Sequence, residues 1–243
     1  MKRIKRFYDT VSVEPVINVK STTRFKLLLD GKQVRTPLGE PFHLRSEAIA
    51  SAVAMEWQLQ TNFVVPNSMP ISTVLMTNMD IDSKLNRTEH LSQIYRYFQT
   101  DSVRFPELDT NSKLGNMQTE RWAPIFTFLK SRGVPFTQSK AGFLLPESTQ
   151  SEINTIGQVI MPSYDSLGLT IIETASKYLK SASIALALVE GVLSPTEAFE
   201  AAFVEEIYQR NEWGLVEGDH DINDAETQLW LHGIQLLSTS LNP

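Results

Sequence analysis

The apolar residues of this 243-residue chain change their spacing near residue 36, and that change constrains the fold more than any other feature. Before that point, runs rich in β-branched residues between positions 6 and 36 flank the pair Asp30-Gly31. An Asp-Gly pair between such runs is a strong hairpin signal, because glycine tolerates a positive φ. We therefore expect a small antiparallel sheet that ends at Pro37 and Gly39.

Beyond the sheet the spacing is helical. Between positions 46 and 60, Ile49, Val53 and Trp57 recur on one face, and Ser46 is placed to cap the first turn. Similar patterns predict helices over 71–80, 84–98, 112–131, 149–161, 163–191, 195–213 and 224–240. A β-like run is expected at 100–105, and a hairpin that returns to a sheet at 134–145.

These patterns predict an α+β protein with two domains. Residues 1–80 should form a small antiparallel-sheet domain of two α/β layers, and residues 81–243 a mainly α-helical bundle domain with an acidic face. The stretch 163–191 is rich in alanine and serine, which allow close approach of neighbouring helices, so we place it at the centre of the bundle. The next helix should begin with a capping box at Ser194 and Glu197 and end at Gly214.

The composition excludes several classes of protein. The absence of cysteine rules out disulfide scaffolds, thiol catalysis, zinc ribbons and iron–sulfur clusters. No run of eighteen apolar residues occurs, so stable membrane insertion is not expected. The net charge of −6 argues against nucleic-acid binding through a global positive field. The sequence also lacks glycine-rich phosphate loops and the G-x-S-x-G and H-E-x-x-H motifs.

The negative charge is concentrated near the C-terminus. Residues 181–243 contain eleven acidic residues and one basic residue, which gives −10, whereas the rest of the chain carries +4. A surface of this kind suits a basic or hydrogen-bond-donating partner. On charge alone, a soluble acidic helical surface without a partner is the favoured interpretation.

The densest group of polar side chains lies in the helix expected at 195–213 and just after it. Its members are Glu205, Glu206, Gln209, Glu212, Trp213, Glu217, His220 and Asp221. Helical spacing puts Glu205, Gln209 and Trp213 on one strip. Phe199, Phe203 and Glu206 fall on an adjacent strip, so we expect Glu206 to point partly inward.

Three interpretations of this group are open. Glu205, Glu206 and His220 could form a carboxylate-based metal-dependent enzyme site, although two carboxylates on one helix make a poor ligand shell. The group could also be a solvated acidic face. A protein-binding surface is the third interpretation, and Trp213 beside patterned polar groups favours it over plain exposure. Trp57 and Trp122 lie on apolar stripes and are expected in the structural core, where Trp57 would clamp the sheet domain to the bundle.

Several sequence blocks resemble the assembly chaperones of the ATP synthase catalytic head, of the type that binds the α subunit (mitochondrial assembly factor 2 and its alphaproteobacterial relatives). The blocks are Lys5-Arg6-Phe7-Tyr8, Leu29-Asp30-Gly31-Lys32 with the K-x-V-x-T-P run to Pro37, Ala54-Met55-Glu56-Trp57, Met69-Pro70-Ile71-Ser72-Thr73, Tyr97-Phe98-Gln99-Thr100-Asp101, Val204-Glu205-Glu206-Ile207-Tyr208-Gln209, Trp213-Gly214 and His220-Asp221. They span nearly the whole chain in the family's order, whereas 134–158 shows no match.

The resemblance implies a chaperone without enzymatic activity or cofactor, which binds the unassembled α subunit, prevents its aggregation and hands it to β. It also implies that Glu205 is the functional glutamate. With the strip and its neighbours, the expected partner-binding residues are Glu205, Gln209, Trp213, Glu206 and Glu212. A monomer is expected in the mitochondrial matrix, with the cytoplasm of an alphaproteobacterium as the alternative location. Because no ATP site is visible in the sequence, we expect release by competition from β.

Overall fold

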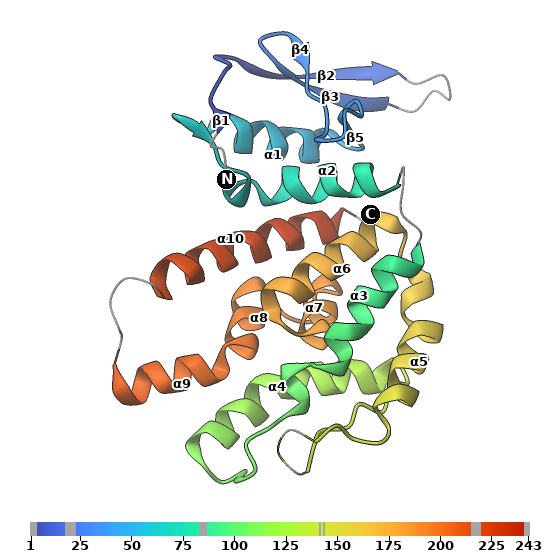
Figure 1. Ribbon diagram of the computed structural model, residues 1–243, viewed down its shortest axis with the longest axis vertical. Helices are drawn as coiled ribbons and strands as arrows, with labels where there is room; N and C mark the ends of the chain where they lie inside the picture. The colour runs from blue at the N-terminus through green and yellow to red at the C-terminus, as the bar shows by residue number, and fades with distance from the viewer. Residues whose placement is uncertain are drawn as a thin grey trace. The chain divides into compact units, whose positions relative to one another are not determined.

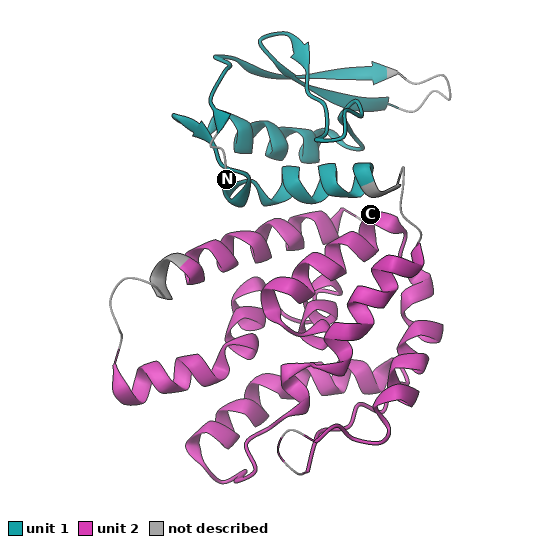
Figure 2. Ribbon diagram, in the orientation of Figure 1, with its two compact units in different colours: residues 1–85 teal, residues 86–243 magenta. Residues whose placement is uncertain are grey.

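The computed structural model describes residues 4–17, 23–82, 87–140, 142, 144–214 and 220–240. The chain forms two compact units, Met1–Leu85 and Asn86–Pro243 (Figure 2). Unit 1 holds small antiparallel sheets and two α-helices, and unit 2 is a helical bundle (Figure 1). The predicted α+β class is therefore confirmed. The division into domains at residue 80 stays a prediction.

Unit 1 contains a four-stranded antiparallel sheet in which the central strand pairs with the other three. The strands are β2 (Val11–Ile17), β3 (Thr23–Leu29), β4 (Lys32–Gln33) and β5 (His43–Leu44), with β3 in the centre. β1 (Ile4–Lys5) and β6 (Phe63–Val64) form a second, two-stranded sheet. The chain turns from β3 to β4 at Asp30 and Gly31, whose φ values of 48° and 74° are those of the predicted hairpin turn.

Two α-helices complete the described part of unit 1. α1 (Glu47–Gln58) packs against β2 and β3 and buries Ile49, Val53 and Trp57, and the Ser46 side chain accepts a hydrogen bond from its first turn. A short 3₁₀ helix, η1 (Pro66–Ser68), leads to α2 (Pro70–Asp82). The carboxylate of Glu56 accepts hydrogen bonds of 2.8 Å from the backbone N–H groups of Ile71 and Ser72. It thereby satisfies free donors at the start of α2 and fixes α2 to α1.

Two expectations for the sheet are wrong. In the four-stranded sheet, pairing starts at Val11 and not at residue 6. Side chains engage the backbone before Val11, since the Asp30 carboxylate accepts from the N–H groups of Asp9 and Thr10. The sheet also continues past Pro37 and Gly39. The chain turns there and returns as β5, which pairs with β3.

Unit 2 is a bundle whose central helix is completely buried. Its helices are α3 (Arg87–Gln99), η2 (Ser102–Arg104), α4 (Lys113–Ser131), α5 (Thr149–Val159), η3 (Met161–Ser163), α6 (Ser166–Leu179), α7 (Ala182–Val189), α8 (Pro195–Ala202), α9 (Val204–Trp213) and α10 (His220–Thr239). Every residue of α7 is buried, and α7 packs against α3, α4, α6, α8 and α10. None of the helices that the structure describes combines the length and apolar character needed to span a bilayer.

Two long helices predicted from the sequence are broken. The stretch 163–191 divides because Lys180 adopts a left-handed conformation (φ 52°, ψ 23°) and Ser181 then caps α7. Local caps therefore override the continuous small-residue pattern. The stretch 195–213 divides at Phe203 (φ −110°, ψ 25°), after the predicted capping box of Ser194 and Glu197 has started α8.

Two predicted β segments of unit 2 are also wrong. The stretch 100–105 contains the 3₁₀ turn η2 and no strand; the Asp101 side chain caps η2 by accepting from the Val103 N–H. Within 134–145, the described residues contain no strand. They bond instead to η2, since the Ser139 N–H donates to the Arg104 carbonyl (2.7 Å) and Gln138 Nε2 donates to the Val103 carbonyl (3.0 Å). Polar contacts with one buried turn thus replace sheet pairing here.

Candidate partner-binding surface

α9 carries the strip predicted from the sequence. The helix is continuous from Val204 to Trp213, so Glu205, Gln209 and Trp213 share one side of it, and all three are exposed. Trp213 is 76% exposed, the largest fraction among the described large hydrophobic residues. An exposed tryptophan beside polar groups is typical of a protein-binding surface.

The break at Phe203 corrects one expectation for this group. The placement of Glu206 beside Phe199 and Phe203 assumed one continuous helix through residue 203. The two phenylalanine rings lie 4.8 Å apart and are buried, whereas Glu206 begins a new helix and is exposed. Glu206 therefore faces solvent and adds its charge to that of Glu205.

Glu205 is held by a buried amide on α4. Gln118 Nε2 donates to Glu205 Oε1 (3.1 Å), and Gln118 Oε1 accepts from the Glu107 backbone N–H (2.7 Å). Gln118 itself is only 1% exposed. Both ends of this amide are engaged, so it fixes the Glu205 side chain relative to α4 and to the loop before α4.

The surroundings of Glu205 disfavour its charged form. Loss of solvent around the carboxyl raises its pKa, and the negative charges of Glu206 and Glu107 raise it further, while the hydrogen bond from Gln118 acts in the opposite direction. Three carboxylates thus share one small region. A cationic or donor group of a partner would relieve their repulsion.

This raised pKa gives a stability prediction. The pKa of Glu205 in the folded protein lies above the ordinary value of 4.5, so the unfolded state loses its proton first as the pH rises. Ionisation of Glu205 therefore reduces stability across the interval between the two pKa values, and has no effect well below 4.5. We expect Glu205→Gln to be more stable than the parent protein above this interval, by less than about 1 kcal/mol because the side chain is exposed.

Urea unfolding measured at about pH 3.5 and about pH 8 checks this prediction. Glu40→Gln, which makes the same substitution at an exposed loop position of unit 1, is the matched control for the loss of one negative charge. A Glu205→Gln variant that is less stable than the parent at the higher pH would mean that the carboxylate is a stabilising structural group.

Ion pairs connect α4 to α8 and α9 in antiparallel order. Lys113 pairs with Glu212, and Arg121 pairs with Glu200 (3.2 Å). Two of the eleven acidic residues of the C-terminal part are therefore paired with bases of α4, a feature that net charge alone could not reveal. Glu212 is engaged by Lys113, which leaves Glu205 and Glu206 as the uncompensated charges of α9 among the described residues.

Aromatic contacts support the far end of the strip. The rings of Tyr208 and Trp213 lie 6.3 Å apart at an interplanar angle of 74°, and Lys113 Nζ lies 6.0 Å from the Tyr208 ring centroid. Such edge-to-face contacts restrict the orientation of an exposed ring. The α9 surface, defined as Glu205, Glu206, Gln209, Glu212 and Trp213, thus combines fixed acidic groups with one large apolar side chain.

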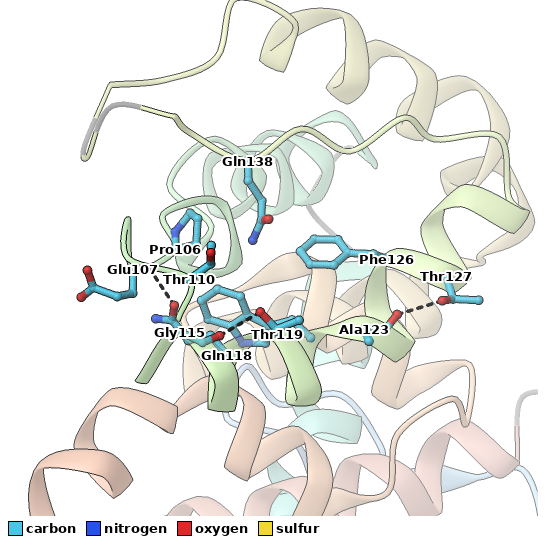
Figure 3. Close-up of a pocket in the computed structure, with 11 residues that line it drawn as sticks. Pro106, Glu107, Thr110, Gly115, Gln118, Thr119, Ala123, Phe126, Thr127 and Gln138 are labelled. Carbon is cyan, nitrogen blue, oxygen red and sulfur yellow. Dashed lines mark hydrogen bonds between the residues drawn. The ribbon is translucent and has the colours of Figure 1, made fainter. Parts of the chain in front are cut away.

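A pocket of about 380 Å³ adjoins this surface (Figure 3). It is lined by Pro106, Glu107, Thr110, Gly115, Gln118, Thr119, Trp122, Ala123, Phe126, Thr127 and Gln138. Gln118 both lines the pocket and bonds to Glu205, so the two features share a side chain. Neither Glu107 nor Gln118 stood out in the sequence, because each lies far from Glu205 along the chain and follows no recognisable motif.

The two tryptophans expected in the core are buried. Trp122 is 2% exposed and its Nε1 donates to the Ala201 carbonyl (2.9 Å) at the end of α8. Trp57 is 9% exposed, and its carbonyl accepts from the Tyr8 hydroxyl (2.7 Å). The described parts of the chain hold no group of three or more His, Cys, Asp or Glu side chains suited to a metal ion. Glu217 and the side chains of His220 and Asp221 lie outside the described residues, so the metal-site interpretation stays a prediction.

The model of the ATP12 chaperone protein family matches residues 5–130, just over half of the chain. The chain belongs to the ATP12 chaperone family. The resemblance to assembly chaperones of ATP synthase that the sequence blocks indicated is thereby confirmed.

Relatives of the ATP12 family match most of the chain. Protein atp12, mitochondrial, of Schizosaccharomyces pombe is 28% identical over 220 residues, which cover 86% of this chain and 75% of that protein. Protein ATP12, mitochondrial, of Saccharomyces cerevisiae is 23% identical, and the match covers 95% of this chain and 82% of that protein. Both are named as mitochondrial proteins.

Solved structures share the ATP12 fold. The crystal structure of Atp12 from Paracoccus denitrificans superposes with a TM-score of 0.76 at 20% identity, over 97% of both chains. A protein of Agrobacterium tumefaciens superposes with a TM-score of 0.81 at 27% identity, over 98% of this chain and 86% of that one. At 20% identity the Paracoccus structure supports only the fold. The assignment of this chain to the ATP12 family rests on the match to the family model.

Proposed function

We propose that this ATP12-family protein binds the unassembled α subunit of the F-type ATP synthase catalytic head, prevents its aggregation, and hands it to β during assembly. The main observation that supports the proposal is that the chain belongs to a chaperone family. The type of client follows from the sequence blocks that resemble the α-subunit chaperones.

The α9 surface is the proposed site of client contact. A subunit destined for a ring exposes apolar interfaces that aggregate when bare. A chaperone must cover such an interface and still yield to the true neighbour, which favours a few fixed polar anchors over a large dry contact. Glu205, positioned by Gln118, and the exposed Trp213 are anchors of this kind.

Release by competition is part of the same proposal. The sequence contains no glycine-rich phosphate loop of the P-loop or dinucleotide-binding type. We therefore expect β to displace the chaperone from α without ATP hydrolysis. Hydrolysis of ATP by the purified protein alone, or a need for ATP to release α, would contradict this step.

Glu205→Lys tests the proposal. Co-expression with α and β of the same organism, followed by pull-down, should show capture of free α by the parent protein and its displacement by β. We expect Glu205→Lys to lower the affinity for α by about tenfold or more, because it places a cation where the partner meets a carboxylate. Circular dichroism should show that the variant remains folded.

Glu40→Lys is the matched control, since it makes the same substitution at an exposed loop position of unit 1. It should capture α as the parent protein does. Loss of folding in Glu205→Lys would assign a structural role to Glu205, and failure of the folded parent protein to capture α would reject the α subunit as client.

A further inference from the structure

We propose that the pocket beside α9 receives an apolar side chain of a bound client segment, while a lysine or arginine next to that side chain meets the carboxylates of Glu107 and Glu205. The inference deepens the proposed function and rests on it for the identity of the client. It adds a second contact, on α4, to the one proposed for α9.

The interior of the pocket is suited to an apolar group. Pro106, Trp122, Ala123 and Phe126 supply its apolar wall. The hydroxyls of two lining threonines are already used within α4, since Thr119 donates to the Gly115 carbonyl (2.8 Å) and Thr127 to the Ala123 carbonyl (2.9 Å), as the dashed lines of Figure 3 show. Pockets with mostly apolar walls and few polar groups bind apolar side chains.

The polar groups of the pocket are fixed in place. Gln118 is engaged at both ends, by Glu205 and by the Glu107 backbone. Gln138, which extends towards the cavity in Figure 3, donates to the Val103 carbonyl (3.0 Å). These amides are therefore held before any ligand arrives, which reduces the entropy lost on binding.

The negative charge at the rim of the pocket favours a client segment with a cationic residue next to the inserted apolar side chain. The Glu107 carboxylate extends away from the cavity in Figure 3, and Glu205 is attached to the same Gln118. Neither glutamate forms an ion pair with a described residue. The nearby bases of α4 are occupied, Lys113 by Glu212 and Arg121 by Glu200. A cation beside the inserted side chain complements this rim, whereas an acidic residue would be repelled.

Two synthetic peptides test the inference on the purified chain: acetyl-Arg-Phe-Arg-amide and acetyl-Glu-Phe-Glu-amide. Nuclear magnetic resonance follows the side-chain amide signals of Gln118 and Gln138 and the indole N–H signal of Trp122. We expect saturable shifts with the arginine peptide, and a Kd at least about fivefold lower than for the glutamate peptide, as two solvent-exposed charge pairs allow. The difference should shrink as salt is added.

Three variants extend the test. Ala123→Phe fills the pocket and should abolish the shifts, whereas Ala225→Phe makes the same change at an exposed position of α10 and should leave them intact. Glu107→Gln keeps the pocket open and should narrow the difference between the peptides. It therefore provides an answer even if Ala123→Phe does not fold.

Equal binding of both peptides, binding of neither, or unchanged shifts in a folded Ala123→Phe variant would overturn the inference. No α subunit is present in this experiment, so its result is separate from the pull-down. Capture of α without peptide binding removes only the pocket inference. Peptide binding without capture of α removes only the proposed client.

Discussion

Glu152→Ala is expected to lower the free energy of unfolding by about 3–5 kcal/mol, because it breaks a buried ion pair and leaves the other charge without a partner. Arg104 is fully buried and Glu152 is 1% exposed, and Arg104 Nη1 lies 2.9 Å from Glu152 Oε2. The Arg104 guanidinium also donates to the Thr137 carbonyl (2.8 Å) and lies 4.2 Å from the centroid of the Phe136 ring. Urea unfolding followed by circular dichroism measures the loss.

The double variant Arg104→Met/Glu152→Leu separates charge from packing. Replacing both charges by apolar residues of similar size removes the desolvation penalty, so this variant should be markedly more stable than Glu152→Ala. A loss below about 1 kcal/mol in Glu152→Ala would show that water or a rearrangement compensates the guanidinium.

The same ion pair gives a role to the stretch 134–158, which matched no family block in the sequence. Thr137 and Glu152 from this stretch enclose Arg104, and Ser148 donates to the second carboxylate oxygen of Glu152 (2.7 Å). The stretch therefore stabilises the bundle by providing polar partners for the buried guanidinium of Arg104. A hydropathy pattern would have assigned this charged side chain to the surface. Periodicity analysis assigns charged residues to the surface, and it could not find this pair.

Local signals of the sequence predicted local structure correctly. The Asp30-Gly31 turn, the Ser46 cap and the capping box of Ser194 and Glu197 all occur as expected, because each depends on contacts within four residues. Such signals fix where elements start. They do not determine whether a long helical pattern continues, since helices end at Lys180 and Phe203, inside patterns that predicted unbroken helices.

The candidate site was predicted only in part. The strip of Glu205, Gln209 and Trp213 follows from helical spacing, whereas the support of Glu205 by Gln118 joins residues 87 positions apart. No spacing rule connects two such positions. The pocket was missed for the same reason, because its lining comes from α4, the loop before it and the stretch after it.

Trp122 is expected to contribute strongly to stability, and the exposed Trp213 provides a matched control for its substitution. Trp122→Ala should lower the free energy of unfolding by about 3–5 kcal/mol, since the side chain is 2% exposed and its removal leaves a cavity. The Ala201 carbonyl also loses its hydrogen-bond donor, which loosens the end of α8 just before α9. Trp122→Phe should cost less, because it retains most of the apolar packing.

Trp213→Ala should change stability little and weaken the binding of α strongly. The side chain is 76% exposed, so its removal should change the free energy of unfolding by no more than about 0.5 kcal/mol. As a proposed anchor, it should weaken binding of α by about tenfold or more. Urea unfolding and titration with α, run on both alanine variants, check the two effects together. Comparable destabilisation by both variants would mean that Trp213 packs in a core, and unchanged α binding by Trp213→Ala would remove it from the partner-binding surface.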